Sequence, residues 1–317
     1  MGTGKRIMLF AGTSNPALSA SVAGALSTSL CGAQIGMFAD GEISVRIDES
    51  VRGHDVFVLQ SVCPPVNDRI MELLVILDAL KRSSAGKITA VLPYYAYARQ
   101  DRQESPRRPI TAKLVADLIT VAGADRVMSI DLHSGQIQGF FSVPFEHLRA
   151  SRVLVPKIAE ITADKDHMVV VSPDAGGVER ARYYSKALSA SLAIIDKRRS
   201  APNVAEVMHV IGDVEGKSCV IVDDMIDTAG TLTKAAAALI ERGACDVYAA
   251  AAHPVLSGPA VDRISNSALS KVFVTDTIPL SPAAACCEQL EVCSVGGLLG
   301  EAITRVHVET SVSSMFR

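Results

Sequence analysis

The length, composition and charge of the chain favour two folded domains and exclude several classes of function. Its 317 residues suit two domains of ordinary size, and 49% hydrophobic residues can bury sizeable cores. A net charge of −3 argues against nucleic acid as a partner, because nucleic-acid-binding proteins usually carry a basic surplus. The sequence has no signal-peptide pattern, no stretch that could span a membrane and only scattered cysteines, so we expect a cytoplasmic protein without a membrane partner.

The first half of the chain carries two polar turns beside aromatic residues. Phe38-Ala-Asp-Gly-Glu42 places a ring next to a turn with two acids, which would suit a purine base. Farther on, Pro93-Tyr-Tyr-Ala-Tyr-Ala-Arg-Gln-Asp101 puts a guanidinium and an amide on a loop. Taken singly, both segments are more often surface turns.

Ser129-Ile-Asp-Leu-His133 ends a predicted strand of the first half. A histidine at a strand terminus near carboxylates could belong to a Mg²⁺ site, although Mg²⁺ prefers oxygen ligands. A histidine hydrogen-bonded within the core explains the segment equally well. We place the domain boundary near residue 150, so that residues 1–150 and 151–317 form the two domains, with a tail that could pack on the first.

The second half begins with another strand that ends in a glycine-rich turn. In Val169-Val-Val-Ser-Pro-Asp-Ala-Gly-Gly177, Asp174 lies at the carboxyl end of the strand, where open α/β sheets bind ligands. Gly176 and Gly177 give a tight turn with free N–H groups that would suit pyrophosphate. A helix carrying Arg180 follows.

Three consecutive cations follow the next predicted strand. Asp196-Lys-Arg-Arg199 leads into the alternating segment 205–211, which favours a mobile hairpin. A basic flap of this kind could close over the phosphates of a nucleotide and neutralise charge that develops in phosphoryl transfer.

The most informative segment is Val220-Ile-Val-Asp-Asp-Met-Ile-Asp-Thr-Ala-Gly-Thr231. A buried strand here delivers a polar loop to the N-terminus of an alanine-rich helix, where loop N–H groups and the helix dipole favour a phosphate. Asp223 and Asp224 would repel a phosphate but can accept hydrogen bonds from the hydroxyls of a sugar. Phosphate donors beside diol acceptors indicate a ribose phosphate.

The two halves of the chain partly repeat each other. Residues 111–124 align with 231–244, and residues 86–93 align with 216–223, so that His133 falls opposite His253. Each copy reads strand, loop, helix, strand. The sequence therefore predicts an α/β protein with two similar doubly wound parallel-sheet domains.

Taken together, these motifs make the whole chain resemble class I ribose-phosphate pyrophosphokinase, also called PRPP synthetase. The resemblance implies domains of the type I phosphoribosyltransferase-like fold and an ATP-dependent enzyme. The family moves the β,γ-diphosphoryl group of ATP to the C1 hydroxyl of ribose 5-phosphate, giving PRPP and AMP, with Mg²⁺ as cofactor. It also implies a homo-hexamer with phosphate as activator and ADP as inhibitor.

The resemblance also implies a role for each matching position. ATP would be bound by Phe38, Asp40, Gly41, Glu42, Arg99, Gln100 and Asp101. Ribose 5-phosphate would be bound by Asp223, Asp224, Asp227, Thr228, Ala229, Gly230 and Thr231. The pyrophosphate loop would comprise Asp174, Ala175, Gly176 and Gly177; His133 and Asp174 would hold Mg²⁺; and Lys197 and Arg199 would be catalytic. The effector site would comprise Ser50, Arg52, Ser83, Arg107, Ser311 and Ser313.

Two alternatives stay open at this stage. A phosphoribosyltransferase would consume PRPP, but it would need neither an ATP half nor the cations near residues 197–199. A catalytically silent, PRPP-synthetase-like regulatory subunit would keep the fold but tend to carry altered active-site segments, whereas His133 and the acidic loop are intact here.

Overall fold

The structure is a computed structural model that describes residues 5–161, 167–198 and 207–316. The chain forms two compact units. The first includes the described residues up to Arg149, together with Thr277–Pro279 and the residues from Val295 on. The second includes the described parts of Ala150–Asp276 and Leu280–Ser294.

The first unit contains a sheet of five parallel strands in the order β1-β4-β5-β6-β7. Its elements are β1 (Ile7–Ala11), α1 (Pro16–Ala25), β2 (Ala33–Met37), β3 (Ile43–Ile47), β4 (Asp55–Leu59), α2 (Val66–Arg82), β5 (Lys87–Leu92), α3 (Thr111–Ala122), β6 (Arg126–Ile130), η1 (Gly135–Phe140), β7 (Phe145–Leu148), α9 (Gly296–His307) and η3 (Ser313–Phe316). β2 and β3 form an antiparallel hairpin. A parallel bridge between Leu9 and Leu30 places the start of this hairpin beside β1.

The second unit contains a seven-stranded sheet in the order β10-β9-β8-β11-β12-β13-β14. Its elements are α4 (Ser151–Ile161), β8 (Met168–Ser172), α5 (Val178–Leu188), β9 (Ser191–Arg198), β10 (Val207–Ile211), β11 (Ser218–Ile226), α6 (Gly230–Glu241), β12 (Asp246–Pro254), α7 (Ala260–Ser265), β13 (Leu269–Thr275), α8 (Pro282–Ala285) and β14 (Leu290–Cys293). All neighbouring strands pair in parallel except β9 and β10, which form an antiparallel hairpin at the edge.

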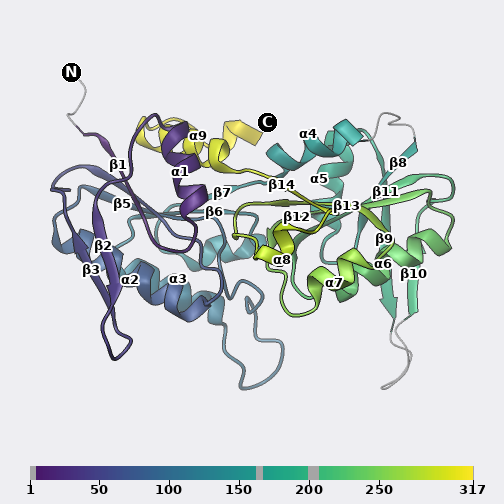
Figure 1. Cartoon of the computed structure of the whole chain (residues 1–317), viewed down its shortest axis with the longest axis horizontal. Helices are drawn as coiled ribbons and strands as arrows, with labels where there is room; N and C mark the ends of the chain where they lie inside the picture. The colour runs from purple at the N-terminus through teal and green to yellow at the C-terminus, as the bar shows by residue number, and fades with distance from the viewer. Residues whose placement is uncertain (1–4, 162–166, 199–206, 317) are drawn as a thin grey trace. The chain divides into compact units, whose positions relative to one another are not determined.

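Helices cover both faces of each sheet, as the sequence predicted for doubly wound domains. In the first unit, α1 packs with α9 and α2 packs with α3. Figure 1 shows these two pairs on opposite sides of the sheet, and α4 with α5 opposite α6 with α7 in the second unit. The prediction of two similar parallel-sheet α/β domains is confirmed.

The predicted register of the internal repeat is wrong by one strand and one helix. Counted along the chain and across the sheets, β4 corresponds to β11 and α2 to α6. The sequence match had instead paired α3 with α6. An alanine-rich helix followed by a β-branched strand is a pattern that several βα units share, so the local match could not distinguish between neighbouring units. His133 therefore has no counterpart in His253, which is buried within β12.

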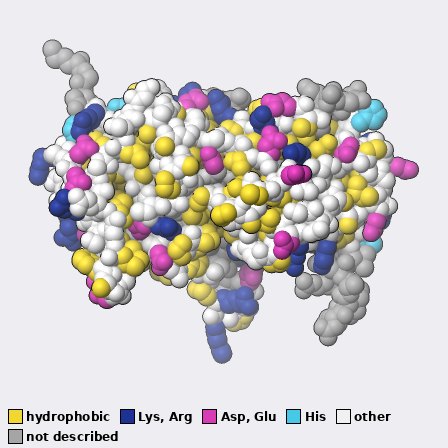
Figure 2. All heavy atoms as spheres, in the orientation of Figure 1, with side chains coloured by type: hydrophobic (Ala, Val, Ile, Leu, Met, Phe, Trp, Pro, Cys, Tyr) yellow, Lys and Arg dark blue, Asp and Glu magenta, His cyan; other side chains and the backbone are white. Residues whose placement is uncertain are grey.

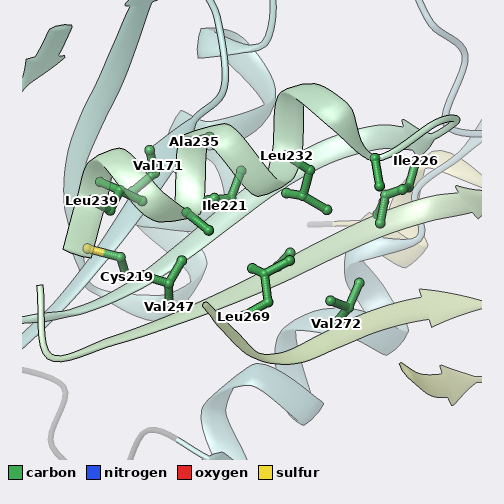
Figure 3. Packing of buried hydrophobic residues seen from close by; sticks show 14 of the residues in the cluster. Val171, Cys219, Ile221, Ile226, Leu232, Ala235, Leu239, Val247, Leu269 and Val272 are labelled. Atoms are coloured by element: carbon green, nitrogen blue, oxygen red, sulfur yellow. The ribbon is translucent and has the colours of Figure 1, made fainter. Parts of the chain in front are cut away.

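The core of the second unit explains the position of α6. Leu232, Ala235 and Leu239 lie on one face of this helix and are buried against strand residues such as Val171 and Ile221 (Figure 3). Burying each leucine stabilises the fold by about 2 kcal/mol. This burial fixes the N-terminus of α6 at the carboxyl end of the parallel strands, directly after β11.

The surface carries both signs of charge. On the face that Figure 2 shows, acidic, basic and apolar side chains are interspersed. None of the helices in the described ranges combines the length and the apolar character needed to cross a bilayer.

Candidate functional site

The loop between β11 and α6 is shaped as an anion site. β11 continues through both predicted carboxylates to Ile226, because Met225 and Ile226 still pair with β12. Ala229 adopts φ +58° immediately before α6, and no side chain caps that helix. The first N–H groups of a helix have no partners within it, so those of α6 can serve a ligand.

A side chain from another helix approaches Gly230 closely at the start of α6. Arg263 of α7 donates from Nη1 to the carbonyl oxygen of Thr228 at 2.9 Å. A Cβ at Gly230 would lie 3.1 Å from the same Nη1 atom. Gly230 is half-buried, whereas Thr228 and Thr231 are exposed, so their hydroxyls can reach a bound molecule.

Arg180 of α5 contacts both carboxylates at the end of β11. Its Nη1 lies 3.2 Å from Oδ1 of Asp223 and 3.2 Å from Oδ1 of Asp224. The Asp224 side chain is 4% exposed, whereas the Asp223 side chain is 35% exposed. The guanidinium therefore holds two neighbouring carboxyl groups together, with Asp223 the more exposed of the two.

The pKa of the Asp223 carboxyl is raised to about 7. Removal from water is the largest cause, and the neighbouring Asp224 charge adds to it, while Arg180 acts in the opposite direction. Near neutral pH this carboxyl is thus present in both its protonated and its ionised form, so it can donate a hydrogen bond to a hydroxyl group as well as accept one.

The loop between β8 and α5 lies in the same unit. Asp174, Ala175 and Gly176 are exposed. Oδ1 of Asp174 accepts from the N–H of Gly177 at 2.9 Å, and the Ser172 hydroxyl donates to the Asp174 carbonyl at 2.7 Å. A Cβ at Gly177 would lie 2.9 Å from the Ser172 Oγ, so glycine permits this turn. The loop is pre-formed and open to solvent.

A cavity of 380 Å³ lies in the first unit between the start of α2 and the loop after β5. It is lined by Pro65, Val66, Asn67, Asp68, Tyr94, Ala96, Tyr97, Ala98, Arg99 and Gln100. Tyr97, at φ +60°, donates from its hydroxyl to Oδ1 of Asn67 at 2.7 Å. This volume and mixed lining suit a small polar ligand.

The predicted ATP residues fall into two groups within the first unit. Gln100 accepts from the Thr111 hydroxyl at 2.6 Å, and Asp101 accepts from the Gln136 amide at 2.8 Å. Arg99 lines the cavity with Gln100. The structure thus brings the loop residues together and orients them through α3 and η1.

The other ATP residues form the turn that joins β2 to β3. The Phe38 N–H donates to the Glu42 carbonyl at 2.8 Å, and the Glu42 N–H donates to Oδ1 of Asp40 at 3.1 Å. Gly41 has φ +95°, which the turn requires. The Phe38 side chain is 58% exposed, so its ring is available to a partner molecule.

The predicted metal ligands belong to different units. His133 follows β6 in the first unit, and Asp174 follows β8 in the second, and both are exposed. Among the described residues, no group of three or more acidic, histidine or cysteine side chains could hold a metal ion.

The predicted catalytic cations lie at the edge of the second sheet. Lys197 is in β9, where it pairs with Met208 of β10. Arg199 lies outside the described residues. The predicted hairpin is confirmed over the described strands, since β9 and β10 pair from Ile194↔Ile211 to Arg198↔Val207.

The predicted effector residues are all exposed and all belong to the first unit. An antiparallel bridge pairs Arg52 with Ala85, which follows Ser83 by two residues, and Ser50 precedes Arg52 by two residues. Ser311 and Ser313 contact each other, with 3.0 Å between their hydroxyl oxygens. Arg107 lies in the loop between β5 and α3.

Comparisons with known proteins agree along the length of the chain. The model for the N-terminal domain of ribose phosphate pyrophosphokinase matches residues 7–123, and the phosphoribosyl synthetase-associated domain matches residues 198–317. The ribose-phosphate pyrophosphokinase of Chromobacterium violaceum is 56% identical over 98% of this chain and 94% of its own length. That of Caldanaerobacter subterraneus is 55% identical over 98% of both chains.

A solved structure supports the fold as well. The crystal structure of phosphoribosylpyrophosphate synthetase from Mycobacterium smegmatis superposes with a TM-score of 0.91 at 48% identity. The match covers 96% of this chain and all of the other.

Proposed function

Because the chain belongs to the ribose-phosphate pyrophosphokinase family, we propose how its residues divide the work of the reaction. The enzyme transfers the β,γ-diphosphoryl group of ATP to the C1 hydroxyl of ribose 5-phosphate, which yields PRPP and AMP. The silent regulatory subunit and the phosphoribosyltransferase are not favoured, since the relatives that match over the whole chain are ribose-phosphate pyrophosphokinases.

The single observation that carries the proposal is the loop between β11 and α6. Its uncapped helix N-terminus would bind the 5-phosphate through residues Asp227 to Thr231, with the Thr228 and Thr231 hydroxyls as further donors. Asp223 and Asp224 would accept from the ribose hydroxyls, with Arg180 holding both carboxylates in place. Residues Asp174 to Gly177 would bind the diphosphoryl side through the open turn after β8.

The first unit would bind ATP. Arg99 and Gln100, which line the 380 Å³ cavity, and the adjacent Asp101 would contact the nucleotide. The exposed Phe38 ring would stack on adenine, with Asp40, Gly41 and Glu42 beside it in the same turn. The turn and the cavity are separate from each other. This arrangement suits a nucleotide, because its base and its phosphates need different binding groups.

Attack at the β-phosphorus requires neutralisation of charge on the transferred group. The cations of Lys197 and Arg199 would supply it from the protein, and such groups can be worth roughly 10³-fold in phosphoryl transfer. We propose Mg²⁺ as the cofactor, with His133 and Asp174 as ligands; bound there, it would neutralise further phosphate charge. Positioning of the C1 hydroxyl supplies much of the remaining acceleration.

Regulation and assembly form the finer part of the proposal. The hydroxyls and guanidiniums of Ser50, Arg52, Ser83, Arg107, Ser311 and Ser313 suit an anion. We propose that phosphate activates and ADP inhibits through these residues, and that the enzyme works as a homo-hexamer. Sedimentation of the purified protein measures the assembly; a monomer at assay concentration would contradict it.

The experiment that tests the proposal is an assay of the purified chain with ATP, Mg²⁺ and ribose 5-phosphate. We expect AMP and PRPP to form in equal amounts, faster with inorganic phosphate and slower with ADP. Chelation of Mg²⁺ should stop both products. Product formation that does not respond to phosphate and ADP would contradict the effector site alone. Absence of both products under every condition would contradict the proposed activity and favour the catalytically silent regulatory subunit.

A further inference from the structure

A buried network of polar side chains lies where the chain of the first unit leaves β1. Thr13 donates its N–H and its hydroxyl to the two carboxylate oxygens of Glu72, at 2.5 and 2.7 Å. Arg69, one turn earlier on α2, donates to the same carboxylate at 3.0 Å. Glu72 is 3% exposed, so its carboxylate is an anion fixed inside the protein.

Gln60 extends the network to the loop that follows β4. Its amide nitrogen donates to Oε1 of Glu72 at 3.0 Å, and its amide oxygen accepts from the Ser14 hydroxyl at 2.8 Å. Gly12 leaves room for both side chains, because a Cβ there would lie 2.2 Å from Oε1 of Gln60 and 2.6 Å from Oε1 of Glu72. Backbone and side chains are thus closely fitted around one carboxylate.

The network occupies the place in the first unit that the phosphate loops occupy in the second. By chain order and sheet order, the loop after β1 corresponds to the loop after β8, and the loop after β4 to the loop after β11. In the second unit the loop after β8 is exposed from Asp174 to Gly176. In the first unit, Glu72 already takes the N–H and hydroxyl of Thr13 and the cation of Arg69.

The same network borders the cavity at the start of α2. Val66, Asn67 and Asp68 line that cavity, and Arg69 and Glu72 follow on the next turn of the helix. The loop after β4 is also tied to the opposite wall, since the Val62 N–H donates to the Tyr94 carbonyl at 3.1 Å. A shift of α2 would therefore move both the cavity wall and the Asn67–Tyr97 contact.

We propose that Glu72 is a positioning residue for nucleotide binding. In the first unit, its carboxylate occupies the position that corresponds by topology to the proposed anion site of the second unit. It thereby holds the first turns of α2 against the cavity. The inference rests on the proposed nucleotide site at this cavity.

Steady-state kinetics of the full-length enzyme test this role. Glu72→Gln keeps the shape but removes the charge, and we expect the KM for ATP to rise roughly tenfold, with kcat and the KM for ribose 5-phosphate within about twofold. Thr13→Val removes the hydroxyl that contacts Glu72 and Arg69 but keeps the N–H that donates to Glu72. It should give a smaller rise of the same kind, which keeps the proposal testable if Glu72 variants fold poorly. In Glu72→Ala, added formate should lower the KM for ATP again, whereas equal ionic strength from chloride should not.

Two further variants separate the possible failures. Asp78→Asn removes a carboxylate from the same helix that pairs with Arg82 at the surface, and it should change neither KM. Arg99→Gln tests the nucleotide site itself. If Arg99→Gln raises the KM for ATP but Glu72→Gln does not, or if formate does not rescue Glu72→Ala, the inference about Glu72 fails alone; if Arg99→Gln has no effect, the proposed nucleotide site fails.

Discussion

The two units repeat one topology but use the carboxyl edges of their central strands differently. In the second unit, an uncapped helix, an exposed glycine turn and a carboxylate with a pKa raised to about 7 are presented to solvent. In the first unit, the corresponding edge is closed by Glu72, and a 380 Å³ cavity opens beside it. The buried carboxylate of Glu72 accepts from the N–H and hydroxyl of Thr13 and from Arg69, so these donors are already occupied in the first unit.

The hairpins of the two units also carry different kinds of side chain. The turn between β2 and β3 carries an exposed ring and two acids, which suits recognition of a base. Lys197 lies near the end of β9, a position that suits neutralisation of phosphate charge. The following substitutions test whether the division between base recognition and phosphate chemistry holds.

The largest effect is expected from Lys197→Ala. We predict that kcat falls roughly 10³-fold while the KM for ribose 5-phosphate stays within about twofold, because the charge matters mainly in the transition state. Steady-state kinetics measure both parameters. Lys186→Ala, an exposed cation on α5, is the matched control. Unchanged turnover would remove Lys197 from the mechanism.

Asp223→Asn tests the sugar side. We predict that the KM for ribose 5-phosphate rises roughly 10- to 100-fold, since a charge-assisted acceptor for the ribose hydroxyls is lost, while the KM for ATP changes little. Substrate titrations of both ligands measure this selectivity. Equal weakening of both substrates would move the carboxylate from the diol to the metal.

Phe38→Ala tests the base side and should have a moderate effect. Loss of ring stacking is expected to raise the KM for ATP roughly 3- to 10-fold and to leave the KM for ribose 5-phosphate unchanged. Met37→Ala is a matched control, because this neighbouring side chain is also largely exposed. If both variants behave alike, the ring has no specific role in nucleotide binding.

The smallest expected effect is on the pH dependence of the free energy of unfolding. An unfolded aspartate titrates near pH ~3.9, whereas the pKa of Asp223 in the folded protein is raised to about 7. The folded state therefore holds this proton more tightly, and the associated stability is present below about pH 4 and lost as the pH rises to about 7.

Relative to Asp223→Asn, the wild type should lose roughly 1 kcal/mol of unfolding free energy across this window, a value reduced because the side chain is one third exposed. Urea unfolding of both proteins between pH 4.5 and 8 measures the difference. Parallel stability curves would show that the Asp223 carboxyl titrates at its ordinary pKa.

Local sequence patterns predicted the elements around the proposed phosphate loops well. Continuous β-branched apolar runs, each followed by a polar turn that contains glycine, identified β8 and β11 and the loops that follow them, because these signals depend only on near neighbours. The uncapped start of α6 also follows from Ala229 and Gly230, which offer no capping side chain.

Long-range contacts could not be predicted from these local patterns. Arg180 was visible in the sequence as a helix residue, but its contact with Asp223 and Asp224 joins residues more than forty positions apart. Glu72 gave no signal, since one glutamate on an amphipathic helix resembles a solvated residue. The cavity beside α2 requires two loops to meet, which no single motif encodes.

Periodicity and short motifs were sufficient to predict the fold class, the family resemblance and the residues of the proposed phosphate loops. Only the tertiary structure decided the register of the repeat, the assignment of α9 to the first unit and the closure of one phosphate position by Glu72. The physical reason is that strand order, helix docking and buried ion pairs arise from packing between distant segments, and many local patterns are compatible with each arrangement.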